Sequence, residues 1–191
     1  MKLAATGSSV VGLAHRQDNH PNQDSVLVQG MRKGWCVAVC DGLGSRQLSH
    51  KGSQLAANLI LSTVRSVKAD HCSANAISVR LQKEWLDAFD QSPSSYDTTC
   101  LWASVDACGQ VKGAQVGDGL LLVRSEGEFL VVTPERSGFG NQTQTLSQAE
   151  LNDWSFVETT LSQVGDGVLL MTDGISDDLI PEQLEPFFDA V

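Results

Sequence analysis

The feature that most constrains the fold of this chain is a succession of short apolar runs, each ended by glycine, aspartate or another turn-forming residue. Apolar runs of roughly four to eight residues between turn signals are typical of buried strands. We therefore predict strands at 3–14, 25–29, 34–40, 98–106, 111–116, 120–124, 128–133, 154–161 and 168–172. The short connections between many of these runs predict antiparallel pairing.

Two segments with helical spacing interrupt the strands. Residues 48–67 place apolar side chains such as Leu55 on one face, and residues 74–89 repeat the pattern. A further helix is expected from Asp177 onward. The polar stretch 134–150 predicts a long loop, and its length suggests a mobile flap. Runs of strands beside paired helices indicate an α+β fold.

The composition limits the class of protein. Apolar residues make up 41% of the 191 residues, which is enough for a packed core. No apolar run approaches the roughly 20 residues of a membrane helix, and no apolar signal core follows Lys2. We therefore expect no membrane segment and no secretory signal. The net charge of −10 and the pI of about 4.6 disfavour nucleic acid as a partner.

The cysteines indicate a reducing environment. The chain has five of them, an odd number without a CxxC pair: Cys36, Cys40, Cys72, Cys100 and Cys108. Those in apolar runs behave as small hydrophobic residues. This usage favours a cytoplasmic location, and a catalytic cysteine is the less favoured alternative.

Aspartates stand where apolar runs end. Asp41, Asp118 and Asp173 each follow such a run and precede a glycine, and Asp24 lies in the polar loop before the second run. Carboxylates at strand ends are held rigidly and are the hard oxygen ligands that Mg²⁺ and Mn²⁺ prefer. Because Asp-Gly is also a common turn dipeptide, turn formation is the alternative for each one alone. We assign Asp166 to a hairpin turn on that ground.

Five short stretches occur in order along the chain: Asn22-Gln23-Asp24, Val39-Cys40-Asp41-Gly42-Leu43-Gly44, Asp97-Thr98-Thr99, Val116-Gly117-Asp118 and Leu170-Met171-Thr172-Asp173-Gly174-Ile175-Ser176-Asp177. Their order and spacing cover nearly the whole chain and resemble the signature of the type 2C family of metal-dependent protein serine/threonine phosphatases. The opening Gly12-Leu13-Ala14-His15, with Pro21 after it, is similar to a bacterial subgroup.

The resemblance implies a four-layer α-β-β-α fold, in which two antiparallel β-sheets pack as a sandwich flanked by helix pairs. It also implies a centre of two Mn²⁺ or Mg²⁺ ions at one edge of the sandwich. The expected substrate is a phosphorylated protein, with a cognate serine/threonine kinase as a further partner. In the implied mechanism, a metal-activated water attacks the phosphorus directly and no phosphoenzyme forms.

The resemblance also assigns roles to residues. Asp41 would bridge both metals, and the carbonyl of Gly42 would bind one of them. Asp24 would help to hold that same metal, directly or through water, and Asp173 would bind the other. Asp118 matches a position that, together with the Asp173 position, holds a third and weaker metal in bacterial members.

The phosphate-binding residue departs from the family. Many members have an arginine three residues before the asparagine of the first stretch, where this chain has Asn19. Arg16 is our candidate to replace it, with His15 as another, because a guanidinium binds phosphate oxygens well. The alternatives are a solvated Arg16 and a packed His15. Arg46 and Lys51 are expected to be solvated.

Other departures concern loops and the chain end. The family's Gly-Thr-Thr is Asp97-Thr98-Thr99 here, a change expected to affect loop shape more than ligation. The family domain usually runs on to a metal-binding Asp-Asn pair, so we expect residues 1–191 to form a single catalytic domain that lacks its C-terminal portion and has reduced activity. We expect Asp177 and Asp178 to open the next helix, where carboxylates favour the helix dipole; partial compensation as metal ligands is the alternative.

Two other functions are left open by the sequence. One is a non-catalytic binding or regulatory module on the same fold, favoured by the substituted arginine and the absent ligand. The other is an unrelated acidic α+β protein whose Asp-Gly pairs only form turns. Stabilisation by Mg²⁺ or Mn²⁺ would argue against the second, because a ligand of the native state raises the melting temperature.

Overall fold

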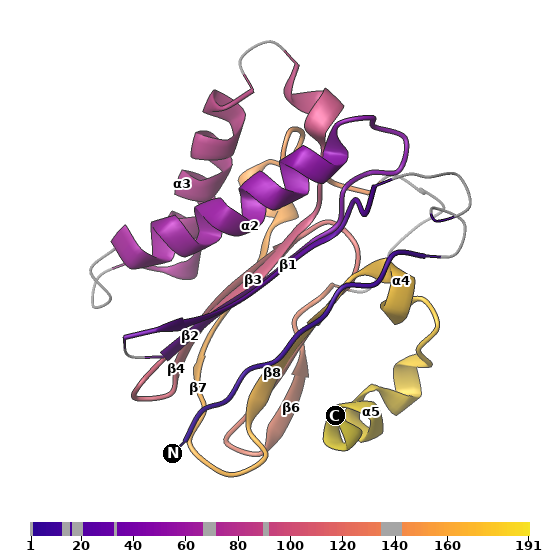
Figure 1. Ribbon diagram of the computed structural model, residues 1–191. Coiled ribbons are helices and arrows are strands. Elements are labelled where there is room, and N and C mark those ends of the chain that lie inside the picture. Colours follow the sequence, from indigo (N-terminus) through magenta and orange to yellow (C-terminus); the bar gives the residue numbers. More distant parts are fainter. Residues whose placement is uncertain are drawn as a thin grey trace.

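The computed structural model describes residues 2–12, 16, 21–32, 34–66, 72–89, 92–134 and 143–191. Two antiparallel sheets pack face to face (Figure 1). The five-stranded sheet has the order β1-β2-β3-β4-β7, with bounds Ser25–Met31, Gly34–Cys40, Cys100–Asp106, Gln110–Val116 and Ser155–Thr160. The three-stranded sheet has the order β6-β5-β8, with bounds Glu128–Val131, Leu120–Ser125 and Gly167–Met171.

Helices cover the outer faces of both sheets (Figure 1). Helices α2 (Ser49–Ser66) and α3 (Ala74–Asp87) lie on the five-stranded sheet, and the shorter α4 (Asp173–Ser176) and α5 (Leu184–Ala190) lie beside the three-stranded sheet. Short 3₁₀ turns occupy Pro93–Tyr96, Leu151–Asp153 and Pro181–Gln183. The expected α+β sandwich is confirmed. No helix among the described residues is long and apolar enough to cross a membrane.

The central strand β3 shows why the layers form. Its side chains alternate between two faces, as in any strand. Cys100 and Trp102 are fully buried against the layer of α2 and α3, where the Trp102 indole donates to Ser78 Oγ. Leu101 and Val105 point the other way, into the space between the sheets. A strand that is apolar on both faces must have a packed layer on each side.

The second sheet repeats this alternation. Leu121 and Val123 of β5 face the other sheet together with Leu101. Leu122 points outward and packs with Leu184 of α5. Arg124, at the end of the same strand, forms ion pairs with two acidic side chains of α5. These contacts hold the C-terminal helix against the sheet and complete the fourth layer.

Most of the predicted elements are confirmed, with bounds shifted by a few residues. The pairing of β3 with β4 and of β5 with β6 follows the predicted hairpins. Residues 143–150 of the expected loop contain turns and no strand or helix. Residues 135–142, which include the rest of the expected flap, lie outside the described residues.

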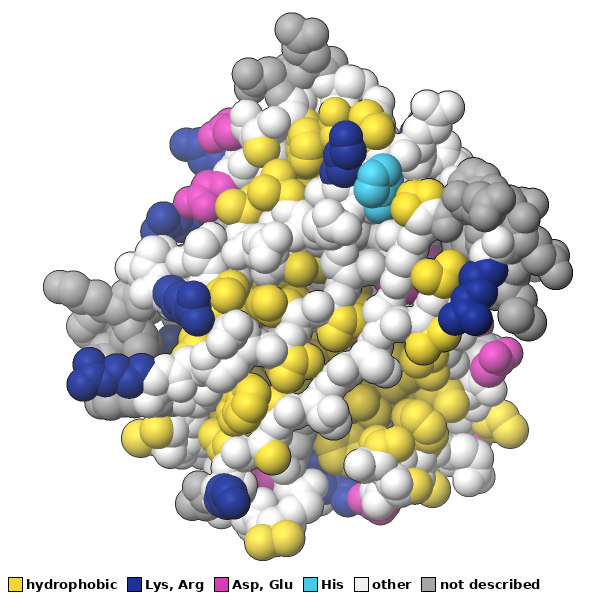
Figure 2. Space-filling model, viewed as in Figure 1, with side chains coloured by type: hydrophobic (Ala, Val, Ile, Leu, Met, Phe, Trp, Pro, Cys, Tyr) yellow, Lys and Arg dark blue, Asp and Glu magenta, His cyan; other side chains and the backbone are white. Residues whose placement is uncertain are grey.

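The strand predicted at 3–14 is wrong for the described residues 2–12, which pair with neither sheet. This segment runs beside the two sheet edges (Figure 1), and apolar side chains reach the surface on both sides of it (Figure 2). Side-chain contacts hold it: the Trp35 indole donates to the Leu3 carbonyl at 3.4 Å, and Gly7 lies against Val28. Apolar composition alone does not supply the neighbouring backbone that a strand needs.

Asp166 does lie in a turn that leads into β8, as predicted, but this turn does not form a hairpin. Residues 161–166 connect β7 to β8, and these strands belong to different sheets. The Asp166 carboxylate accepts backbone N–H groups from both this connection and the β5–β6 turn, at Ser162, Gln163, Glu126 and Gly127. Burial tends to raise the pKa of Asp166, but these four donors together lower it. Asp166 therefore ties two loops together.

Candidate active site

Asp24, Asp41 and Asp173 meet at one edge of the sandwich, although they are distant in the sequence. Asp24 precedes β1 and Asp41 follows β2, and the pairing of Ser25 with Cys40 places both aspartates at the same end of this strand pair. Asp173 follows β8 of the other sheet and begins α4. The carboxyl groups of Asp24 and Asp173 both lie within hydrogen-bonding reach of the Asp41 carboxyl group.

This crowding changes the acidity of Asp41. Burial, the negative charge of Asp24 and the contact with Asp173 together raise the pKa of Asp41 from 3.8 to about 9. Each cause acts against the charged form, because a carboxylate loses its hydration and faces other carboxylates. Without a cation, Asp41 therefore holds its proton at neutral pH. A strongly raised pKa at a strand end is typical of a functional site.

The chemistry of these donors fits a divalent cation. Oxygen ligands that repel one another are stabilised by a positive charge between them, and Mg²⁺ and Mn²⁺ prefer carboxylates. Among the described residues, however, no three His, Cys, Asp or Glu side chains form a ready ligand cluster. Asp24 and Asp173 each approach Asp41, so the three carboxyl groups meet through Asp41.

Backbone contacts from the Asp97-Thr98-Thr99 stretch fix the Asp41 loop. The Asp41 N–H donates to Thr99 Oγ1 at 3.0 Å, and the Asp41 carbonyl accepts from both Thr98 Oγ1 and the Thr99 N–H at 2.8 Å. Gly42 forms an isolated bridge with Thr98. These bonds leave the Asp41 side chain free to face Asp24 and Asp173.

Gln23 holds the same loop from the other side. Its buried side-chain amide donates to Ser49 Oγ at 2.7 Å and to the Arg46 carbonyl at 3.2 Å. Its backbone carbonyl accepts the Gly42 N–H at 3.2 Å. A Cβ on Gly42 would stand only 2.7 Å from that carbonyl oxygen and 2.9 Å from Ser49. Glycine is therefore required here by close packing.

The Gln23 role was not predicted from the sequence. Glutamine between Asn22 and Asp24 gave no signal beyond the family resemblance. Its function depends on the start of α2 lying beside the Asp41 loop, and only the folded chain creates that neighbourhood.

Asp118 lies in a separate loop, between β4 and β5. It is not among the groups that shift the pKa of Asp41. Thr143 Oγ1 donates to Asp118 Oδ2 at 2.6 Å. The flanking Gly119 has a φ of +96° and packs tightly against the Met171 carbonyl, two residues before Asp173. The loop that carries Asp118 therefore packs against the end of β8, and the role of Asp118 as a metal ligand stays a prediction.

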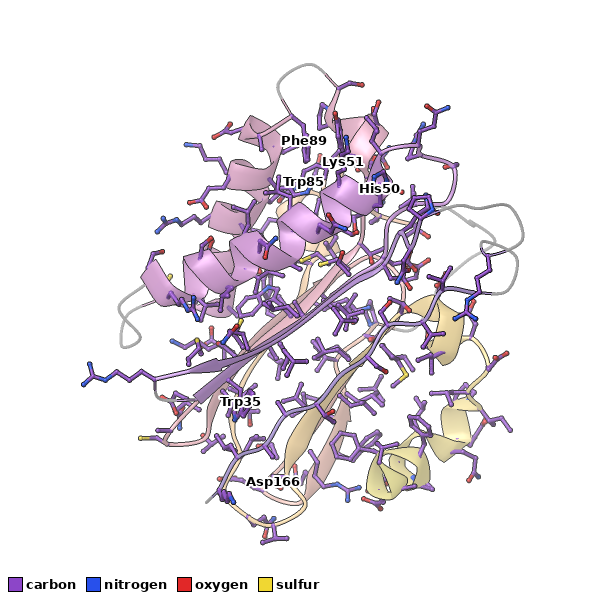
Figure 3. All side chains as sticks on the ribbon, viewed as in Figure 1. Trp35, His50, Lys51, Trp85, Phe89 and Asp166 are labelled. Atoms are coloured by element: carbon purple, nitrogen blue, oxygen red, sulfur yellow. The ribbon has the colours of Figure 1, made fainter. Side chains whose placement is uncertain are left out.

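The positively charged candidates are exposed. Arg16 is exposed, and its backbone N–H donates to Gly12 at 3.1 Å; its role in binding phosphate stays a prediction. His15 and Asn19 lie outside the described residues. Arg46 and Lys51 are both exposed, as expected, and Figure 3 shows Lys51 near the start of α2.

The expectation that Asp177 and Asp178 open a helix is wrong. Asp177 is the C-cap of α4, and its N–H donates to the Asp173 carbonyl at 3.0 Å. The helix begins four residues earlier, at Asp173, because the chain turns as soon as it leaves β8. The next regular turn begins at Pro181.

Comparisons with known proteins agree with this architecture. A family model described as protein phosphatase 2C matches residues 11–191. The chain therefore belongs to the protein phosphatase 2C family. No curated protein matches it.

Several solved structures share the fold. RsbX in complex with magnesium is 21% identical with a TM-score of 0.57, over 83% of this chain and 68% of that chain. A bacterial serine phosphatase is 16% identical with a TM-score of 0.67, over 88% and 79% of the two chains. The photosystem II phosphatase PBCP is 18% identical with a TM-score of 0.62, over 89% and 66%. At these identities the likeness establishes the fold.

Proposed function

We propose that this chain hydrolyses phosphoserine and phosphothreonine in proteins with the help of two Mn²⁺ or Mg²⁺ ions, and with a third at Asp118. The main support for the proposal is that Asp24, Asp41 and Asp173 meet at one edge of the sandwich, and the raised pKa of Asp41 agrees with this crowding. The family supports phosphatase chemistry. A cognate kinase would supply the phosphorylated substrate.

The carboxylates would hold the metals in a defined arrangement. Asp41 approaches both Asp24 and Asp173 and would contact both metals. Asp24 and the Gly42 carbonyl would bind one metal, and Asp173 would bind the other. When bound, the ions supply charge neutralisation and an activated water. The chain itself contributes rigid positioning of these ligands, and Arg16 would contact the substrate phosphate.

The proposal is tested by phosphate release from a phosphothreonine peptide with Mn²⁺, with and without a chelator. Asp41→Asn is the test variant, and Asp166→Asn is the matched control, because Asp166 lies at the far end of the molecule (Figure 3). We expect release that needs Mn²⁺ and Asp41 and that survives in Asp166→Asn. Equal release by the wild type and Asp41→Asn would refute the proposal.

A second candidate is a non-catalytic module that binds metal or phosphoprotein. The observation that favours it is that no three His, Cys, Asp or Glu side chains form a ready metal cluster among the described residues. Stabilisation of the wild type by Mn²⁺ without release of phosphate from any phosphopeptide would select this candidate.

A further inference from the structure

We propose that Asp97 is a positioning residue that sets how Asp118 is presented to a divalent cation; this inference rests on the proposed function. Asp97 is completely buried. Its Oδ1 accepts the Ser147 N–H at 3.2 Å, and its Oδ2 accepts the Ser147 hydroxyl at 2.8 Å. A buried carboxyl group is costly unless such bonds compensate it.

The Asp97 backbone reaches the centre of the site. Its carbonyl accepts the Leu43 N–H at 3.0 Å, two residues after Asp41. The adjacent Thr98 accepts the Leu146 N–H at 3.0 Å and donates its hydroxyl to the Asp41 carbonyl. Asp97 therefore stands at a junction between the Asp41 loop and residues 143–150.

Residues 145–149 are anchored to the core and to α3, and Thr143 lies two residues before this anchored segment. Leu146 is completely buried in the core between the five-stranded sheet and its helices. Gln82 of α3 donates to the carbonyls of Leu146 and Ala149 at 3.0 and 2.7 Å. The Asp97–Ser147 contact fixes the middle of this segment. Thr143 is the residue that donates to Asp118.

The hydrogen bond from Thr143 orients the Asp118 carboxylate. Partners that orient a metal ligand typically change metal affinity about 10- to 100-fold when removed. In this proposal Asp97 acts on Asp118 through Ser147 and Thr143. The loss of Asp97 should therefore raise the metal concentration needed for half-maximal hydrolysis. Its loss should have little effect on turnover at saturating metal, because Asp41 and Asp173 are retained.

The experiment compares Asp97→Asn with Thr143→Val in the full chain. Asparagine keeps the size of the side chain, but its amide nitrogen cannot accept a hydrogen bond from Ser147. We measure the Mn²⁺ concentration for half-maximal hydrolysis, kcat, and Mn²⁺ binding by calorimetry. We expect each variant to raise the half-maximal Mn²⁺ concentration about 10-fold, and the double variant to add nothing further. Asp166→Asn, which removes another multiply bonded carboxylate, should leave Mn²⁺ dependence unchanged.

Several outcomes would overturn the proposal. In the first, Asp97→Asn lowers the melting temperature and leaves the Mn²⁺ dependence unchanged. In the second, Asp97→Asn and Thr143→Val raise the half-maximal Mn²⁺ concentration additively. In the third, Asp166→Asn raises that concentration as much as Asp97→Asn does. If Asp97→Asn does not fold, Ser147→Ala keeps the carboxylate and removes one donor, and we expect a smaller rise in the same direction; no rise would reject the role. If the wild type binds Mn²⁺ without hydrolysis, the proposed function fails while the binding isotherms still decide this inference. A wild type that binds no Mn²⁺ refutes both.

Discussion

Replacing Asp41 by asparagine should stabilise the metal-free protein while removing its response to Mn²⁺. The folded chain holds the Asp41 proton far more tightly than an unfolded chain, with a pKa of about 9 against 3.8. This group therefore favours the folded state fully below pH 3.8, and the metal-free fold loses stability as the pH rises from there toward 9. Asparagine carries no charge at any of these pH values, and its amide can donate to Asp24 and Asp173.

The size of the effect follows from the pKa difference. A shift from 3.8 to about 9 at 1.36 kcal/mol per unit sets an upper value of about 7 kcal/mol. The carboxyl groups can move apart and admit water, which reduces such penalties substantially. We therefore expect Asp41→Asn to raise the free energy of unfolding by about 2–4 kcal/mol at pH 8, or the melting temperature by roughly 5–15 °C for a chain of this size.

The assay is thermal unfolding between pH 5 and 9, in chelator and in Mn²⁺. The wild type should lose stability with rising pH in chelator and regain it with Mn²⁺, whereas Asp41→Asn should do neither. An Asp41→Asn protein that melts at or below the wild-type temperature at pH 8 in chelator would refute the electrostatic account of this site.

Three further predictions concern packing and loops. Gly42→Ala should destabilise the fold by about 1–3 kcal/mol, because its Cβ would meet the Gln23 carbonyl; the control Gly44→Ala should be nearly neutral, since its nearest contact is 3.8 Å. Asp166→Asn should lower the melting temperature at pH 7, and this difference should fade as the pH falls through the lowered pKa of Asp166. Leu101→Ala, between the sheets, should cost about 2–5 kcal/mol in urea unfolding.

Each of these three predictions would be refuted by a specific result. Equal stability of Gly42→Ala and Gly44→Ala would contradict the close packing of the Asp41 loop. An Asp166→Asn difference in melting temperature that does not shrink as the pH is lowered would contradict the charge-dependent contact between the two loops. A loss under 1 kcal/mol for Leu101→Ala would mean that the space between the sheets is not tightly filled.

The local sequence was sufficient to predict most strands and helices and to identify the candidate metal ligands. The buried strand ending at Cys40 and the helices at 48–67 and 74–89 have periodicities that depend only on neighbouring residues. Placing Asp41 and Asp173 at strand ends was possible for the same reason. Their family resemblance supplied the expected roles, and the structure brings both together with Asp24.

The wrong predictions share a cause. Residues 2–12 have the composition of a strand, yet strand formation needs a neighbouring backbone to pair with. The Asp166 turn looked local, but its connection crosses between sheets. Asp177 looked like the start of a helix, but α4 begins at Asp173.

Long-range contacts decided the environment of the site. Adjacent residues alone fix which side chains are apolar, where strands end and which aspartates stand there. The folded chain, in contrast, crowds Asp41 enough to hold its proton, fixes the Asp41 loop with Gln23, and places Asp97 so that it accepts a hydrogen bond from Ser147, 50 residues away. The physical reason is that periodicity is a property of adjacent residues, whereas burial, hydrogen bonding and pKa depend on residues that meet only after the sheets have packed.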